Sequence, residues 1–267
     1  MKQNITLIKL GGSIITNKEV PMMVREDVLK RLVAEIVKAQ NETGELYIVG
    51  HGQGSFAHAP ALRYKTMDGF INDESPIGMA ITQDSAAQLN RIVVTEFLAA
   101  GVPAVSFNFS NTLVTKNGVA EHWCSAVLEE YLAKGLFPIT GGDVIVDSAQ
   151  GCTIWSTEKV LGHIAQHFAD SAKYTVKKMI HVAEVEGVLD GMGKVIPEIT
   201  SSNLENVHQL ITSTKGFDVT GGMAHKLEES MKLAVGGVKT GIITGLKRDV
   251  LYTSLTTEKI HGTEITI

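Results

Sequence analysis

Glycines and two histidines are concentrated in the stretch HGQGSFAH, residues 51–58. Gly50, Gly52 and Gly54 have no Cβ, so the backbone can adopt positive φ there and successive N–H groups can face one anion. His58 adds a side chain whose charge changes near neutral pH and which can donate a hydrogen bond to a phosphate oxygen. The stretch therefore predicts a phosphate-binding loop.

Two other interpretations fit the same stretch. Gly52-x-Gly54-x-x-Ala57 matches a dinucleotide-binding fingerprint, with Asp73 and Glu74 near the distance expected for a ribose carboxylate. Pro60 argues against a helix that starts directly at the glycines, which that fingerprint requires. For this stretch taken alone, a glycine-rich strand-to-loop turn without a ligand is the favoured interpretation, and the phosphate-binding loop depends on the further motifs.

Two lysines in the first 20 residues could neutralise a phosphate. Lys9 ends the β-rich run Ile5–Leu10 and precedes Gly11-Gly12-Ser13. A lysine between apolar residues and a Gly-Gly turn requires an anionic partner. Lys18 follows nine residues later and could reach the same anion, although an exposed lysine is the simpler interpretation of that residue.

Acidic and glycine-rich segments follow three later strand-like runs. Asp143, after Gly141-Gly142, could orient lysines or organise a metal-bound nucleotide, or hydrogen-bond within its own turn. Glu184 opens an acidic segment, 184–190, that suits ribose hydroxyls but is also common in turns. In GFDVTGGMAHK, residues 216–226, Asp218 or Thr220 could cap a helix and Gly221-Gly222 could approach a phosphate.

The elements that would position these residues alternate between strand and helix. The segment Glu26–Ala39 has apolar residues every three or four positions and predicts an amphipathic helix between two strands. Strand, helix and strand in about 50 residues imply parallel strands with ligand loops at their carboxyl ends. The other expected elements are strand Leu46–Val49, helix Pro76–Ala100, strand Pro103–Phe107, a hairpin turn at Asn117-Gly118, helix Ser125–Lys134, strand Leu136–Thr140, hairpin Val144–Trp155, helix Glu158–Phe168, strand Tyr174–Ala183, a helix ending near Val235, and strands Gly241–Leu246 and Glu264–Ile267.

Composition excludes several classes of protein. The chain has 267 residues, of which 44% are hydrophobic and 20% charged, so it is not mainly disordered. Its net charge of −5 gives no electrostatic case for binding nucleic acid. Cys124 and Cys152 lack CxxC spacing and are expected to be reduced. Without a leader pattern or about 18 uninterrupted apolar residues, the protein is expected to be cytoplasmic and not bound to a membrane.

Together, the motifs in residues 9–18, 51–58, 142–143 and 218–226 resemble those of the amino acid kinase superfamily, over nearly the whole chain. Within it, the chain is most similar to the isopentenyl phosphate kinases, whose loop HGGGSFGH is matched except at Gln53 and Ala57. His58 is the discriminating residue. Kinases of carboxylates, such as acetylglutamate kinase, lack this histidine, whereas fosfomycin kinases share part of the pattern.

The resemblance implies an α/β fold, an open three-layer αβα sandwich with a mainly parallel central sheet. It implies one domain, residues 1–267, with an acceptor lobe over about 1–170 and a nucleotide lobe over about 171–267. The implied reaction transfers the γ-phosphoryl group of ATP to isopentenyl phosphate, with Mg²⁺ but without direct protein ligands to the metal. A homodimer is expected on the resemblance alone.

The resemblance also assigns roles to residues. Lys9, Lys18 and His58 are the expected catalytic residues. The expected ATP-binding residues are Lys9, Gly11, Gly12, Ser13, Gln53, Glu184, Gly221, Gly222 and Lys226. The expected acceptor-binding residues are Gly52, Gly54, Ser55, Ala57, His58, Gly142 and Asp143.

Some residues depart from the family pattern, and two other functions stay open. Ser156-Thr157-Glu158 stands where relatives have Ser-Gly-Asp, and Val185-Glu186-Gly187 where they have Val-Asp-Gly; both keep a carboxylate. The other functions are phosphorylation of a different small phosphate or phosphonate, such as fosfomycin, and nucleotide binding without catalysis. The aliphatic residues of 77–94 could form an apolar wall for an isoprenoid tail, or ordinary core.

Overall fold

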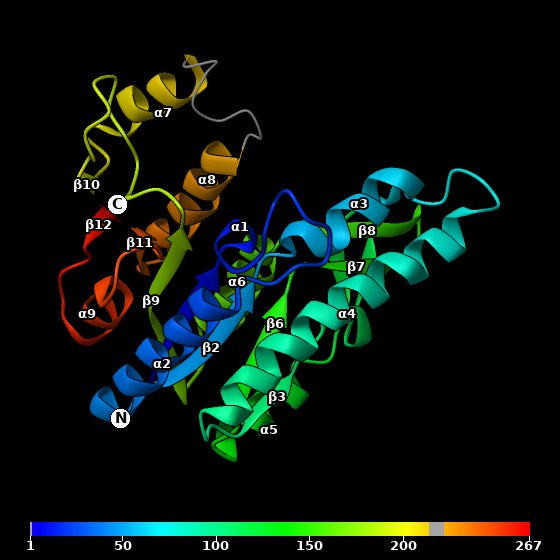
Figure 1. Ribbon diagram of the computed structural model, residues 1–267, viewed down its shortest axis with the longest axis horizontal. Helices are drawn as coiled ribbons and strands as arrows, with labels where there is room; N and C mark the ends of the chain where they lie inside the picture. Colours follow the sequence, from blue (N-terminus) through cyan, green and yellow to red (C-terminus); the bar gives the residue numbers. More distant parts are fainter. Residues whose placement is uncertain (1, 214–221) are drawn as a thin grey trace.

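The computed structural model describes residues 2–213 and 222–267. A large eight-stranded sheet forms the centre of this part of the structure (Figure 1). Its strands have the order β10, β12, β11, β9, β1, β2, β6, β3. Neighbouring strands are parallel except for β11 and β12. The bounds are β1 Gln3–Leu10, β2 Leu46–His51, β3 Ala104–Ser106, β6 Phe137–Gly141, β9 Tyr174–Ala183, β10 Glu198–Ile199, β11 Lys239–Thr244 and β12 Gly262–Ile265. The predicted mainly parallel sheet is confirmed.

Helices cover both faces of this sheet. Successive strand residues point to opposite faces, so Leu7 and Ile8 of β1 enter two different apolar cores. The core around Ile8 is covered by α1 (Gly12–Ile15), α2 (Glu26–Thr43), α4 (Ser75–Ala99) and α9 (Val250–Thr256). The core around Leu7 is covered by α5 (Ala126–Ala133) and α6 (Thr157–Phe168). A third core lies under α7 (Leu204–Ser213) and α8 (Gly222–Val235). The predicted three-layer sandwich is confirmed.

Helix α2 is longer than its apolar pattern indicates. Leu29, Leu32, Val33 and Ile36 are buried, as the periodicity predicts. The helix then continues for a polar turn beyond Ala39 and ends at Gly44, whose φ is 66°. Glycine tolerates this left-handed conformation, which terminates helices. The apolar period therefore located the packed face of α2 but not its last turn.

A second, four-stranded sheet has the order β5, β4, β7, β8. Its strands are β4 (Leu113–Lys116), β5 (Val119–Trp123), β7 (Asp143–Asp147) and β8 (Gly151–Trp155). Asn117 and Gly118 have φ of 49° and 74°, the geometry that the Asn-Gly signal predicts for a tight hairpin. Both hairpins are confirmed. The pairing of the two hairpins into one sheet, through β4 and β7 with Thr115 opposite Asp147, was not predicted.

The expectation drawn from Pro60 is wrong. Helix α3 (Gly54–Tyr64) begins directly at the glycine loop and contains Pro60. Proline removes one intrahelical hydrogen bond, but α3 is supported by packing against α4, where Gly78 lies directly against the Tyr64 side chain. A nearby packing partner thus keeps the helix continuous past the proline.

Candidate active site

The loops after β1 and β2 touch through their backbones. A Cβ on Gly12 would lie 2.4 Å from the amide nitrogen of Gly54, and a Cβ on Gly52 would lie 2.7 Å from the amide nitrogen of Gly12. Of Gly50, Gly52 and Gly54, only Gly54 has a positive φ. Two of the three predicted glycines are therefore needed for close approach rather than for an unusual turn.

Side-chain hydroxyls fix the relative position of these loops. The hydroxyl of Thr16 donates to the carbonyl of Gly12 at 2.7 Å and accepts from the amide of Ser55 at 3.1 Å. The predicted ATP residues Gly11, Gly12 and Ser13 are thereby joined to the predicted acceptor loop. The arrangement holds the amides of two loops in place before any ligand binds.

A third loop, after β6, is attached to the same structure. The hydroxyl of Thr157 accepts from the amide of Gly142 at 2.9 Å and donates to the carbonyl of His51 at 2.7 Å. The side-chain amide of Gln53 donates to the carbonyl of Gly142. Thr157 therefore links the loops after β2 and β6.

Lys9 finds its anionic partner within the protein. Its Nζ lies 2.7 Å from a carboxylate oxygen of Glu158, and both side chains are buried. Burial alone would raise the pKa of Glu158, but the charges of Lys9 and His181 and the hydrogen bond from Lys9 lower it to about 2. Glu158 is therefore ionised and positions Lys9 at the end of β1.

Asp143 does not orient the lysines, contrary to one of the sequence-based alternatives. Its carboxylate accepts from the backbone amides of Ser110 at 3.1 Å and Val144 at 2.8 Å. Burial raises its pKa. The lysine-orienting role falls to Glu158, which lies at the start of α6, close to the end of β1 in space but far from it in sequence.

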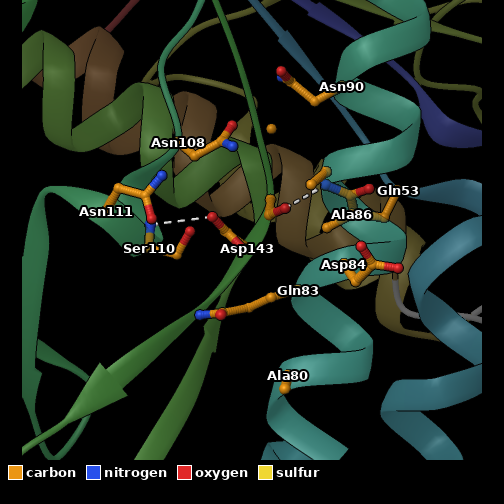
Figure 2. A pocket seen from close by; sticks show the side chains of 13 residues that line it. Gln53, Ala80, Gln83, Asp84, Ala86, Asn90, Asn108, Ser110, Asn111 and Asp143 are labelled. Carbon is orange, nitrogen blue, oxygen red and sulfur yellow. Dashed lines mark hydrogen bonds between the residues drawn. The ribbon is translucent and has the colours of Figure 1, made fainter.

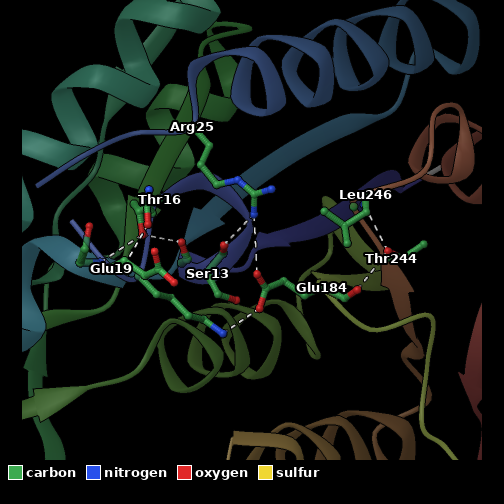
Figure 3. A network of polar contacts seen from close by, with 12 residues as sticks. Ser13, Thr16, Glu19, Arg25, Glu184, Thr244 and Leu246 are labelled. Atoms are coloured by element: carbon green, nitrogen blue, oxygen red, sulfur yellow. Dashed lines mark hydrogen bonds and ion pairs between the residues drawn. The ribbon is translucent and has the colours of Figure 1, made fainter. Parts of the chain in front are cut away.

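Lys18 is held by a different carboxylate. Its Nζ lies 2.7 Å from Glu184, and Arg25 approaches the other oxygen of Glu184 at 3.6 Å. Figure 3 shows Arg25 also reaching the carbonyl of Ser13, to which it donates at 3.3 Å. The Lys18 side chain is 65% exposed. The structure thus brings two predicted site residues, Lys18 and Glu184, into one exposed ion pair.

His58 lies on the exposed side of α3, and its Nδ1 contacts the carbonyl of Gly54. A carbonyl oxygen can only accept, so Nδ1 carries the hydrogen. In the neutral ring, Nε2 is then an acceptor. Nε2 can donate to a phosphate only in the protonated imidazolium. Ala57 is buried beside it, and Ser55 is half-buried.

The predicted nucleotide residues of the C-terminal half are only partly described. Gly221, Asp218 and Thr220 lie outside the described residues. Gly222 begins α8, and Lys226 follows one turn later on that helix. In the described residues, no group of three or more His, Cys, Asp or Glu is placed to hold a metal ion.

Two further sequence predictions can be compared with the structure. Cys124 and Cys152 are both free, as predicted. None of the helices within residues 2–213 and 222–267 has the length and apolar character that a membrane span requires.

The residues that sequence reasoning left out of the site are Thr16, Thr157 and Glu158. Glu158 had a usable signal, because the resemblance aligns it with the aspartate of the family's Ser-Gly-Asp pattern. Thr16 and Thr157 gave none, since their partners come from other loops. Each acts through contacts that only the folded chain creates.

The fold and the contacts among the glycine-rich loops after β1, β2 and β6 are typical of one class of enzyme. A sequence profile of the amino acid kinase family matches residues 4–245, and the chain belongs to that family.

Within it, the chain is 30% identical to an isopentenyl phosphate kinase of Methanocaldococcus jannaschii over 98% of both proteins. It is 32% identical to one of Methanothermobacter thermautotrophicus over 97% of this chain and 98% of the relative. An X-ray structure of an isopentenyl phosphate kinase matches with a TM-score of 0.82 and 27% identity, covering 98% of this chain and 100% of the other. The chain is thus a member of the isopentenyl phosphate kinase group.

Proposed function

We propose that the protein transfers the γ-phosphoryl group of ATP to isopentenyl phosphate, giving isopentenyl diphosphate and ADP. The observation that carries the proposal is the backbone contact between the loops after β1 and β2, beside the Lys9–Glu158 pair. Two phosphorylated ligands must meet where those loops meet. The similarity to isopentenyl phosphate kinases over nearly the whole chain supports the choice of acceptor.

The chemistry requires positioning more than base catalysis. An oxygen of the acceptor phosphate supplies the electron pair for a new bond to the γ-phosphorus, and the bond from that phosphorus to the β–γ bridging oxygen breaks. The bridging oxygen leaves with the bonding pair as part of ADP. The second pKa of a phosphate monoester is about 6, so the attacking oxygen is already ionised near neutral pH.

Charge neutralisation is divided among three lysines. Lys9, held by Glu158, would face the transferring phosphoryl group, and Lys18 would leave Glu184 to reach the same group. Lys226 of α8 would bind the ATP phosphates. The amides of residues 52–55 would bind the acceptor phosphate, with His58 donating from Nε2 as the imidazolium.

Mg²⁺ would supply positive charge on the β- and γ-phosphates of ATP. In this proposal the cation is held by phosphates and water, without direct protein ligands, as the resemblance to the family implies. The division into acceptor and nucleotide lobes, the homodimer and the cytoplasmic location are further parts of this proposal.

A product-resolved assay tests the function. Purified protein, ATP and Mg²⁺ should convert isopentenyl phosphate to its diphosphate, with one ADP formed per product. Fosfomycin serves as the competing acceptor. Phosphorylation of fosfomycin without turnover of isopentenyl phosphate would reassign the activity, and ATP binding without transfer to either would favour a non-catalytic role.

A further inference from the structure

A cavity of about 250 Å³ opens beside the acceptor loop. Figure 2 shows Gln83 and Asp84 of α4 on one side of it and Ser110, Asn111 and Asp143 on the other. Gln53 and Gly142 also line it. Because Gln53 lies within the glycine loop, a group attached to a phosphate in that loop has this cavity directly next to it.

The lining of the cavity is polar. Five of its residues are amides and two are acids, and its only side chains without polar atoms are those of alanines. The amides are Gln53, Gln83, Asn90, Asn108 and Asn111, and the acids are Asp84 and Asp143. Among the described residues, no Lys, Arg or His lines the cavity. It therefore offers hydrogen bonds to a neutral group and would repel a second anionic group.

Among the described residues, no large aliphatic residue of α4 lines the cavity. Leu89, Val93 and Val94 are buried in the core around Ile8. These three side chains support the core interpretation of residues 77–94, whereas Ile77, Ile81 and Ile92 are exposed and line neither the core nor the cavity. The face of α4 that lines the cavity carries smaller or polar residues: Ala80, Gln83, Asp84 and Ala87.

Some acceptor capacity in the cavity is unused. The Oε1 atom of Gln53 is shielded from solvent and has no hydrogen-bond partner among the described residues. Its amide nitrogen donates one of its two hydrogens to the carbonyl of Gly142, whereas the oxygen has no partner in the described part of the chain to satisfy it. Asp84, which accepts from Gln88, presents a further carboxylate. A hydrocarbon in the cavity would leave the Gln53 oxygen unpaired, whereas a ligand hydroxyl would satisfy it.

We propose that this cavity binds a hydroxyl group on the organic part of the acceptor, so that the enzyme also phosphorylates hydroxylated short-chain alkyl phosphates. The inference rests on the proposed function, because it assumes that the acceptor phosphate sits in the loop at residues 52–55. Transfer follows the same bond exchange, and the hydroxyl is not consumed. The hydroxyl donates to Gln53 or Asp84 and orients the acceptor.

The test compares two acceptors that share a carbon skeleton. Isopentenyl phosphate carries a terminal alkene, and 3-hydroxy-3-methylbutyl phosphate carries a tertiary hydroxyl instead. A site that hydrogen-bonds a substrate hydroxyl discriminates strongly against an analogue without one, so we expect kcat/KM to favour the hydroxylated compound by at least about tenfold. Isothermal calorimetry should give a preference in the same direction without turnover.

Two leucine variants on α4 show where the preference arises. Ala87→Leu fills the cavity and should bring the kcat/KM ratio of the two acceptors close to one. Ala99→Leu is the matched control, because Ala99 is an exposed alanine of the same helix that does not line the cavity. It should leave both rates and the melting temperature unchanged.

The outcomes separate this inference from the proposed function. Turnover of isopentenyl phosphate with equal or lower use of the hydroxylated compound would overturn the inference and keep the function. A wild-type preference that survives unchanged in a folded Ala87→Leu variant would also overturn it. Tighter binding of the hydroxylated compound without transfer to either acceptor would support the inference and reject the function. Binding of neither compound would reject both.

Discussion

Lys9 and Glu158 form a buried ion pair of 2.7 Å although they are 149 residues apart in the sequence. The pair joins the end of β1 to the start of α6. The position of the proposed catalytic lysine therefore depends on the packing of α6, a helix from the second half of the chain.

Because of this ion pair, substitution of Lys9 should reduce stability as well as turnover. Lys9→Ala should lower the free energy of unfolding by about 3–5 kcal/mol, because it leaves the Glu158 carboxylate buried without a partner. The double variant Lys9→Met/Glu158→Gln should recover much of this stability, since no unpaired charge remains, but not turnover. Chemical denaturation and steady-state rates measure the two effects. Equal stability of Lys9→Ala and wild type would contradict the role of the pair.

Lys18 should behave differently, since its ion pair is exposed. Surface pairs contribute about 0–1 kcal/mol, so Lys18→Ala should leave the melting temperature nearly unchanged and greatly reduce kcat. Lys247→Ala is the matched control, because Lys247 forms a similarly exposed pair of 2.6 Å with Glu186. Both variants should fold like wild type. A wild-type rate in Lys18→Ala would remove this residue from the mechanism.

His58→Ala should reduce transfer to isopentenyl phosphate by about 10²–10³-fold, the usual effect of losing one donor to transition-state charge. His58→Gln keeps an N–H donor and should retain more activity. ATP binding and the melting temperature should change little, because the side chain is exposed. His122→Ala, at another exposed histidine, is the control. A role in packing would instead appear as lower stability with both ligands affected.

His51 should make stability sensitive to acid. Burial lowers its pKa from 6.5 to about 4, although a hydrogen bond to the backbone of Gly52 acts in the opposite direction. Between these values the unfolded chain binds a proton that the folded protein does not, so the free energy of unfolding falls as the pH falls from 6.5 to 4. The loss amounts to roughly 3 kcal/mol.

Denaturation midpoints measured across this pH range check the prediction. His51→Gln should be less stable at neutral pH and should show a flatter dependence on pH. The exposed His122→Gln control should keep the wild-type slope. Glu158, whose pKa is lowered to about 2, adds its own loss of stability only below pH 4.5. An unchanged slope in His51→Gln would assign the acid sensitivity to other groups.

Gly12→Ala should damage the site through the contact with the second loop. Its Cβ would lie 2.4 Å from a backbone nitrogen, so one loop must move, at a cost of about 1–3 kcal/mol. We expect at least a tenfold loss of kcat/KM, in line with about 10²-fold for misplacement by 1 Å. Gly191→Ala, where a Cβ meets no atom within 4 Å, is the control. Full activity of Gly12→Ala would show that the loops adjust freely.

The sequence determined the layers of the fold and the motifs of the site. Apolar periodicity located the packed face of α2, since burial on one face of a helix imposes a period on the sequence. The glycine and lysine motifs identified the loops after β1 and β2 for the same local reason: phosphate-binding geometry requires particular residue types at fixed spacing.

Only the tertiary structure decided which side chains meet. Glu158 becomes the partner of Lys9, and Asp143 does not, because α6 packs beside β1 and carries its carboxylate there. Helix α3 continues through Pro60 because α4 supports it. The cavity is polar because α4 turns Gln83, Asp84 and Asn90 toward it, while Leu89, Val93 and Val94 pack into the core. Each depends on the relative placement of distant elements, which no local pattern of residues specifies.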